Sequence, residues 1–584
     1  MVQFRFSPSR LTSASLALSG LMAVPQLWAA SLWVNDQNML RPAALEAARR
    51  LAQAENDGLN PAQYAGPQLL QSVQASQGRS LDAASAASLD AQLTEKVELY
   101  LQHLRNGRVD PRQLSENYDA NKTDWRAFDA ATALRDALGT GNLASAWEAA
   151  TPRVPMYANL RKALEQERRL AGNPAWADSL PALPKGGKLG NGQAWSGLAM
   201  LTQRLVAMGD LPAGTAAPAT YTKTLQDGVK VFQQRYGLPE NGILNKATLD
   251  KLNESPRQRA DRIALAMERL RWTPLQQGYR TIVVNVPEFR LRAYDSAGGQ
   301  FEPKVSMRVI VGKALDTRTP MFDEDMRYIE FSPYWNVPPS IARSETIPKI
   351  RRDPGYMSRN GFEIVGQGGL QGVLNGTARI RQKPGPSNAL GDIKFVFPNN
   401  QNIYLHHTSS PGLFNRSKRD FSHGCIRVEE PVQLAKFVLQ DDPAWTEDRI
   451  RKAMGSGKSN TVRLKEPLPV VITYMTTVVS NGQLLFFPDL YGHDRKLAAL
   501  LAQGKTTRSQ PKSSIPLQKS SGAASAASLQ YASCTVFHDC YMKGRSVAAV
   551  NRQPAFFLFF CALHATLATP HAPKQLARMY PGCH

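Results

Sequence analysis

The sequence predicts a multidomain α+β protein in which two helical domains precede a β-rich domain. Apolar residues recur at helical spacing through residues 40–180, and a compact unit over residues 195–253 repeats this spacing between glycine-containing turns. From Tyr279 onward, alternating and β-branched runs replace the helical spacing, which is typical of strands. These changes of pattern and the linkers between them divide the chain into domains at residues 31–190, 191–255 and 256–503.

The N-terminus has the features of a secretory signal peptide. Arg5 and Arg10 supply a basic start, residues 11–24 form a short apolar run, and Ala29 and Ala30 offer a cleavage point. The apolar run is short for a membrane span. We therefore predict a signal peptide over residues 1–30 and an exported mature protein.

One cysteine stands alone in the body of the chain. Between residues 31 and 533 the sequence holds only Cys425, so no disulfide can form within that part. Exported proteins meet an oxidising environment, which favours paired cysteines. Catalysis therefore explains an unpaired thiol better than the alternative, which is inert burial of Cys425.

The formal net charge of +22 favours anionic surroundings, such as a cell-wall polymer or phospholipid head groups. Nucleic acid is the usual partner of a basic protein. Export and the absence of a concentrated basic helix or nucleic-acid motif argue against that partner here.

Residues 504–584 differ from the rest of the chain. They begin with a Ser/Ala/Gln/Lys-rich stretch and hold nine Lys or Arg against one acid, Asp539. Their four cysteines have spacings that match no zinc motif. We predict a low-complexity or disordered tail, and an off-frame extension is the alternative.

The segment Ser422-His423-Gly424-Cys425-Ile426-Arg427 surrounds the lone thiol with groups that can activate it, and His406 lies 19 positions before Cys425. A free thiol is mostly protonated at neutral pH, while the thiolate is the nucleophile. An imidazole that removes the proton would make Cys425 reactive.

An insertion at about residues 323–390 interrupts the predicted strands. It has an aromatic and proline-rich stretch at residues 331–340, a helical pattern at residues 341–351 and a glycine-rich span that ends near Asn388. Such an insertion can fold over a site as a lid. Trp335 would then line a groove, although burial in a small core is the commoner role of such an aromatic.

The small helical unit resembles the three-helix peptidoglycan-binding domain. The resemblance rests on the pairs Phe232-Gln233, Gly237-Leu238 and Asn241-Gly242 and covers residues 191–255. It implies that this unit contacts peptidoglycan, and the alternative is that these residues only build its core.

The β-rich domain resembles the L,D-transpeptidase catalytic domain. The resemblance rests on His406, the Ser422–Arg427 motif, the stretch at residues 381–391 and the Tyr-Trp-Asn-Val-Pro-Pro stretch that begins at residue 334. The order of these motifs is similar to the large form of that family, which has an N-terminal scaffold domain, a peptidoglycan-binding domain and a lid.

The resemblance implies a cysteine acyltransferase that needs no cofactor or metal ion. Cys425 would attack the carbonyl between meso-diaminopimelate and the terminal D-Ala of a tetrapeptide stem, release D-Ala and form a thioester. The amine of a second stem would then form a 3,3 crosslink. Donor and acceptor stems would be the partners, alongside other cell-wall synthases, in a Gram-negative periplasm.

The resemblance also implies a role for each motif residue. His406 matches the catalytic base, the backbone carbonyl of His407 would orient its imidazole, and His423 ranks second as base. Backbone amides around Gly424 and Cys425 would stabilise the oxyanion. The expected substrate contacts are Arg427, whose planar guanidinium suits a carboxylate but would otherwise form a surface salt bridge, and Tyr404, Ser422 and Trp335.

Several alternatives remain open. Water in place of the amine would make the protein an L,D-carboxypeptidase, and another acceptor would make it an enzyme that attaches lipoprotein to peptidoglycan. A peptidoglycan-binding scaffold with a silent catalytic domain is the non-enzymatic alternative. A papain-like amidase would normally place its cysteine before its histidine. A zinc site would need the adjacent His406 and His407, which point to opposite faces of a strand.

Overall fold

The computed structural model describes residues 31–114, 128–273, 280–295, 302–315 and 317–504. The predicted signal peptide and nearly all of the predicted tail lie outside these residues. Within the described residues, no helix is long and apolar enough to cross a membrane. The predicted α+β class is confirmed, because two helical regions precede a large mixed sheet.

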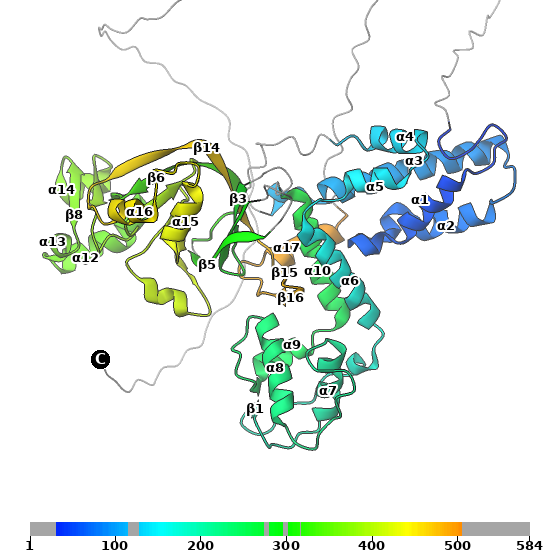
Figure 1. Ribbon diagram of the computed structural model, residues 1–584, viewed down its shortest axis with the longest axis horizontal. Coiled ribbons are helices and arrows are strands. Elements are labelled where there is room, and N and C mark those ends of the chain that lie inside the picture. The colour runs from blue at the N-terminus through cyan, green and yellow to red at the C-terminus, as the bar shows by residue number, and fades with distance from the viewer. Residues whose placement is uncertain (1–30, 115–127, 274–279, 296–301, 316, 505–584) are drawn as a thin grey trace, which may run out of the picture. The chain divides into compact units, whose positions relative to one another are not determined.

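The first helical region is built from amphipathic helices with polar caps. In α3 (Ala83–Asn106), Leu93, Val97 and Leu101 are fully buried at a spacing of four, and Asp82 caps the helix by accepting from the Ser85 N–H. Figure 1 shows α3 beside α4 and α5. The remaining helices of this region are α1 (Pro42–Ala52), α2 (Gly66–Ala75), α4 (Ala130–Gly139), α5 (Ala144–Ala150) and α6 (Pro155–Leu170).

The second helical region contains three helices and a two-stranded sheet, and Gln233 organises its turns. The Gln233 side chain accepts from the Gly242 N–H at 2.9 Å and donates to the Ile243 carbonyl at 3.0 Å. Gly242 has φ +65°, which favours glycine. The motif residues therefore hold this fold together. The elements are β1 (Lys188–Leu189), α7 (Leu198–Ala207), α8 (Lys223–Arg235), β2 (Leu244–Asn245) and α9 (Lys246–Leu252).

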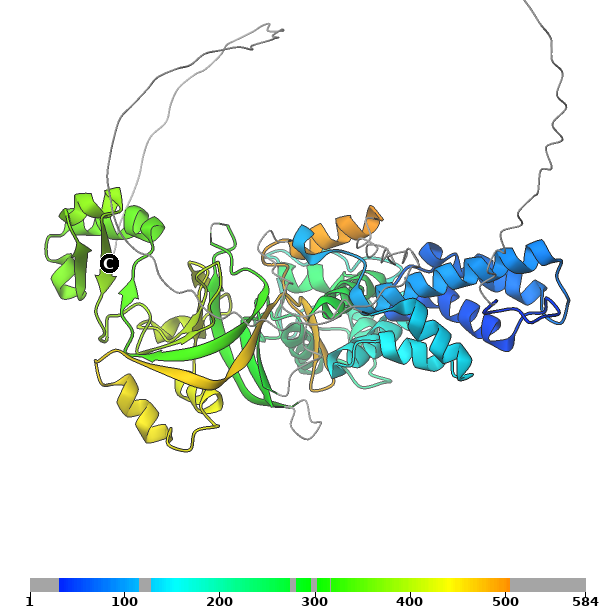
Figure 2. The ribbon, with the colours of Figure 1, turned by 90° about the horizontal axis from the view of Figure 1, so that it is seen from above.

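The β-rich domain is a nine-stranded sheet in the order β12-β5-β13-β11-β10-β6-β14-β3-β4, and it closes on itself because β4 also pairs with β5. Figure 2 shows the long strand β14 beside β6. Helices α15 (Pro431–Val438) and α16 (Glu447–Met454) pack on its core. The strands are β3 (Arg280–Asn285), β4 (Arg290–Asp295), β5 (Pro303–Gly312), β6 (Phe322–Phe331), β10 (Ile393–Val396), β11 (Leu405–His406), β12 (Asp420–Ser422), β13 (Ile426–Val428) and β14 (Asn460–Thr473).

The predicted insertion forms a small module with its own core, which includes Val337, Ile347 and Ile380. The module covers residues 335–382 instead of 323–390, because residues 323–331 belong to strand β6 of the main sheet. We call residues 335–382 the lid module. Its elements are β7 (Trp335–Asn336), α11 (Pro339–Ile341), a π-helix (Ala342–Thr346), α12 (Ile347–Arg352), α13 (Tyr356–Arg359), β8 (Phe362–Gly366), α14 (Gly369–Asn375) and β9 (Ala378–Gln382).

Helix α10 (Pro256–Trp272) corrects the expectation that residues 256–272 belong to the β-rich domain. Its buried residues Ile263, Ala266 and Met267 join the core of the first helical region, where the helix packs on α6. This apolar face explains the difference, since it needs a helical partner.

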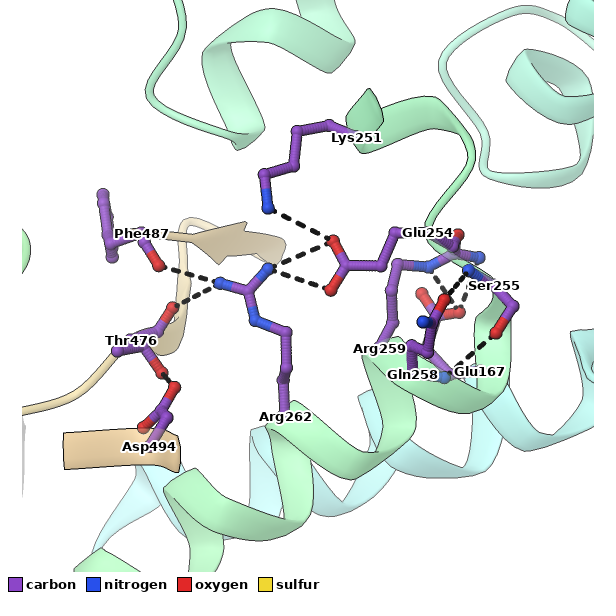
Figure 3. Close-up of polar contacts among 10 residues, drawn as sticks. All are labelled: Glu167, Lys251, Glu254, Ser255, Gln258, Arg259, Arg262, Thr476, Phe487 and Asp494. Atoms are coloured by element: carbon purple, nitrogen blue, oxygen red, sulfur yellow. Dashed lines mark hydrogen bonds and ion pairs between the residues drawn. The ribbon is translucent and has the colours of Figure 1, made fainter. Parts of the chain in front are cut away.

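The chain after β14 returns to the helical regions as β15 (Thr477–Ser480), β16 (Gln483–Phe486) and α17 (His493–Ala502). Arg262 of α10 donates to the Phe487 carbonyl at 2.8 Å and contacts the Glu254 carboxylate at 3.2 Å (Figure 3). The Phe486 ring stacks on Tyr236 with centroids 4.9 Å apart. This C-terminal segment thus ties the β-rich domain to both helical regions.

Candidate active site

Two short parallel strands bring the predicted residues together. In the register of β11 and β13, Leu405 lies opposite Ile426 and His406 lies opposite Arg427. Leu405 and Ile426 are fully buried in the core. Because side chains alternate between the faces of a strand, the neighbouring positions share the other face. That face carries Tyr404, His406, Cys425 and Arg427.

His406 is buried and has an oriented imidazole. Its Nδ1 lies 2.5 Å from the His407 carbonyl oxygen. Burial, with a contribution from the Arg427 charge, lowers the pKa of His406 to about 3. The ring is therefore neutral at neutral pH, and donation from Nδ1–H leaves the lone pair on Nε2. A neutral, oriented imidazole of this kind can act as a base.

The Cys425 thiol is held in its protonated form. Burial raises its pKa, and contacts with Tyr404 and the charges of Lys394 and Arg427 oppose that rise. The sulfur lies 3.6 Å from the Asn402 carbonyl oxygen, to which the S–H donates. A thiol in this state becomes a nucleophile only when a base removes its proton.

The turn before Cys425 is pinned by hydroxyl groups. The Ser422 hydroxyl donates to the Cys425 carbonyl at 2.5 Å and accepts from the Gly424 N–H at 3.2 Å. Thr319 donates to the Gly424 carbonyl at 2.7 Å. Gly424 has φ +113°, so the turn requires glycine.

These contacts correct two expectations. The Gly424 N–H is already occupied by the Ser422 hydroxyl, which narrows the expected oxyanion donor to the N–H of Cys425. Ser422 itself is buried and serves the turn, so its hydroxyl is not presented to a substrate.

The other two predicted histidines point to different partners. His407 Nδ1 lies 2.8 Å from the Asp392 carboxylate, and His423 Nε2 lies 2.6 Å from the Glu345 carboxylate of the lid module. His423 is exposed, whereas His406 is buried. Among the described residues, no group of three or more His, Cys, Asp or Glu side chains is arranged to hold a metal ion.

Arg427 and Tyr404 border the thiol. Arg427 is partly buried and its Nε has no hydrogen-bond partner among the described residues, and burial lowers its pKa. Burial raises the pKa of Tyr404 well above its ordinary value, and Cys425 adds to that rise. A hydrogen bond with Trp335 opposes this rise in the pKa of Tyr404. The Trp335 ring also packs on the lid core, with its centroid 6.3 Å from that of the Phe362 ring.

Family models match three consecutive parts of the chain. Residues 279–472 match the "L,D-transpeptidase catalytic domain", and this range holds the whole site described above. Residues 279–472 are thus similar to an L,D-transpeptidase catalytic domain. The "Scaffold domain" matches residues 29–164, and the "Putative peptidoglycan binding domain" matches residues 196–252.

The chain is also similar in sequence to a curated protein. A "Putative L,D-transpeptidase" of Haemophilus influenzae is 34% identical over 246 residues, which is 40% of this chain and 48% of the relative. The chain thus spans about half the length of that curated relative.

Among solved structures, the L,D-transpeptidase of Stackebrandtia nassauensis is 14% identical, with a TM-score of 0.19, and the match covers 49% of this chain and 94% of that one. The L,D-transpeptidase of Xylanimonas cellulosilytica is also 14% identical, with a TM-score of 0.16, and the match covers 51% of this chain and 98% of that one.

The candidate site includes residues that the sequence did not predict. Lys394 lies opposite His406 in the β10–β11 register, and its Nζ lies 4.4 Å from the Tyr404 ring centroid. Asn402, whose backbone carbonyl accepts the hydrogen bond of the thiol, has φ +54°, a conformation that Asn tolerates better than most residues. The Asn-rich turn at residues 399–402 was the available signal for Asn402. Lys394 had no such signal, since cross-strand register decides its position.

Proposed function

We propose that the protein is an L,D-transpeptidase that forms 3,3 crosslinks in periplasmic peptidoglycan through a thioester on Cys425. The observation that carries this proposal is the shared face of Cys425, His406, Tyr404 and Arg427 within the matched catalytic domain. A neutral imidazole and a protonated thiol on one face are the resting partners that general-base activation of a nucleophile requires.

In the first half-reaction, His406 Nε2 accepts the thiol proton as the sulfur attacks the carbonyl between meso-diaminopimelate and D-Ala. The Cys425 N–H donates to the oxyanion that forms. The imidazolium then returns its proton to the amine of D-Ala, which leaves, and the thioester remains. The His407 carbonyl stabilises the transient imidazolium through Nδ1–H.

In the second half-reaction, the side-chain amine of another stem attacks the thioester and gives up a proton to His406. The C–S bond breaks, the amide of the crosslink forms, and the thiolate takes the proton back from the imidazolium. Water in the place of the amine would release a tripeptide, so the fate of the thioester separates crosslinking from trimming.

Arg427 is proposed to bind a carboxylate of the stem. The guanidinium lies beside the thiol and no carboxylate pairs with it among the described residues, which supports a role toward an incoming anion. The peptidoglycan-binding match over residues 196–252 supports the same polymer as substrate and partner.

The test is mass spectrometry of the products formed by the purified protein and by its Cys425→Ala variant from a disaccharide tetrapeptide. We expect a crosslinked dimer that has lost one D-Ala, and none with the variant. Tripeptide alone would identify a carboxypeptidase, and unchanged substrate with both proteins would contradict an enzymatic role for this site.

A further inference from the structure

We infer that Glu345 is a positioning residue, which fastens the lid module to the catalytic motif and protects the thioester from water until the acceptor amine attacks. The inference rests on the proposed function for its chemical consequence. Its structural basis is the contact of 2.6 Å between the Glu345 carboxylate and His423 Nε2.

The sequence forces an unusual backbone at Glu345. Residues 342–346 form a π-helix, in which the Ile347 N–H donates to the Ala342 carbonyl. Pro348 follows and has no N–H for the preceding turn, so the regular pattern of an α-helix is interrupted there. Single π-helical turns are rare and occur frequently at functional sites. In this protein the π-helical turn carries the residue that meets the catalytic motif.

The contact joins two parts that fold around different cores. Glu345 belongs to the lid module, whose core includes Val337, Ile347 and Ile380. His423 lies two residues before Cys425 in a turn that Ser422 and Thr319 pin to the main sheet. Because the turn is rigid, a carboxylate that binds His423 fixes the lid module relative to the thiol.

Other carboxylates of the lid module have partners close to them. Glu363 pairs with Arg381 on the neighbouring strand β9, and with Lys383, which directly follows that strand. Asp353 pairs with Arg359 within the module. Glu345 also lies 3.7 Å from Lys349, one helical turn later, yet its shortest contact crosses to His423. Glu345 therefore differs from Glu363 in what it connects, and Glu363 provides a matched control.

A fastened lid affects the two fates of the thioester differently. Closure excludes water from a site and commits the bound substrate. Loss of the Glu345 contact would admit water more often, so hydrolysis would gain on crosslinking, while formation of the thioester would change little. Both side chains are about one-third exposed, at 33% for His423 and 38% for Glu345. We therefore expect a moderate effect, a two- to fivefold rise in the ratio of hydrolysis to crosslinking, on the order of that of a solvent-exposed ion pair.

The experiment compares the full-length wild type with Glu345→Gln, Glu345→Ala and the control Glu363→Gln. Three quantities are measured for each: the ratio of tripeptide to crosslinked dimer, the rate of Cys425 acylation by a carbapenem, and hydrogen exchange of residues 339–376. We expect both Glu345 variants to raise the product ratio two- to fivefold and to speed exchange in the lid module, with acylation within twofold of wild type. The control should match the wild type in all three.

A double variant, Glu345→Gln with His423→Gln, tests whether the pair acts as one unit. If it does, hydrogen exchange of the lid module in the double variant should be little faster than in Glu345→Gln alone. Equal product ratios and equal exchange in wild type, Glu345→Gln and Glu363→Gln would overturn the inference while the proposed function stands. A wild type that forms no product would overturn the proposed function, and the exchange data alone would then decide the inference about the lid.

Discussion

The active site and the junction around helix α10 bury arginine side chains in opposite ways. At the junction, Arg259 meets Glu167 at 2.8 Å, and both side chains are buried (Figure 3). In the active site, the Nε of Arg427 is buried without a hydrogen-bond partner among the described residues. A buried charge is costly unless it is paired. The buried guanidinium of Arg259 is thus paired with a carboxylate, whereas no carboxylate pairs with Arg427 among the described residues.

Two histidines near the thiol in sequence repeat this contrast. His423 pairs with the Glu345 carboxylate and is exposed, while His406 is buried and its imidazole lies beside the backbone carbonyls of His407 and Leu390. The difference shows that proximity in sequence to Cys425 is a poor guide to the base. Burial without a carboxylate keeps an imidazole neutral, and a neutral imidazole can accept a proton.

The largest effect should come from His406→Gln. Removal of a positioned general base slows a reaction on the order of 10²- to 10⁴-fold, and we expect this decrease in the rate of Cys425 acylation. Time-resolved mass spectrometry of the acyl-enzyme measures it. His423→Gln is the control and should acylate much faster than His406→Gln. Equal losses in the two variants would mean that the site has no single base.

The next largest effect should appear at the junction. Arg259→Met leaves the Glu167 carboxylate buried and without its partner, so we expect a loss of about 3–5 kcal/mol in the free energy of unfolding. Urea denaturation followed by circular dichroism measures this quantity. The double variant Arg259→Met, Glu167→Met should recover most of the loss, because no charge remains buried. No recovery would show that packing of Arg259 on Trp176, 4.9 Å away, matters more than charge.

Replacing an arginine of the active site by methionine should affect activity and leave the stability of the protein nearly unchanged, in contrast to Arg259→Met. Arg427→Met removes a guanidinium that is costly to bury, so the free energy of unfolding should stay the same or rise by up to about 1 kcal/mol. Crosslinking should fall about tenfold to hundredfold if Arg427 binds a carboxylate of the stem. A large loss of stability in this variant would remove the contrast between site and junction.

The smallest effect concerns pH. Burial lowers the pKa of His103 to about 3, as it does for His406, so both histidines stay neutral in the folded protein while the unfolded chain takes up protons below about pH 6.5. Each histidine therefore makes unfolding easier as the pH falls through 6.5 toward 3. The free energy of unfolding of the wild type should fall between pH 7.5 and pH 5.5. In His103→Gln this fall should be smaller by about 1 kcal/mol, and in His406→Gln it should be smaller by the same amount. Urea titrations at the two pH values measure it. An unchanged pH dependence in either variant would mean that its histidine is protonated in the folded state.

Much of the architecture could be predicted from the chain. Helical spacing identified α3 and α8, and β-branched runs identified β3 and β5, because these elements bury one face or both faces over most of their turns or residues. Helix α10 was assigned to the wrong domain. Its periodicity predicts a buried face, but it does not tell which neighbouring core receives that face.

The site was predicted as a set of residue types more reliably than as a set of contacts. Cys425, His406, Tyr404 and Arg427 do share one face. Ser422 and the Gly424 N–H were expected to meet the substrate, yet each is used within the turn. Glu345 and Lys394 were missed, since they come from the lid module and from a neighbouring strand, far from the motif in sequence.

The sequence alone determined which residues can do chemistry: a lone thiol, a histidine 19 positions before it and an arginine two positions after it. It also determined part of the local structure around them, because Gly424 permits the positive φ of its turn and Pro348 lacks the N–H of a regular helical turn. Only the tertiary structure decided which histidine is buried and neutral, which guanidinium lies beside the thiol, and which lid carboxylate meets the motif. Those properties depend on desolvation and on the register of distant segments, which arise from the folded arrangement as a whole.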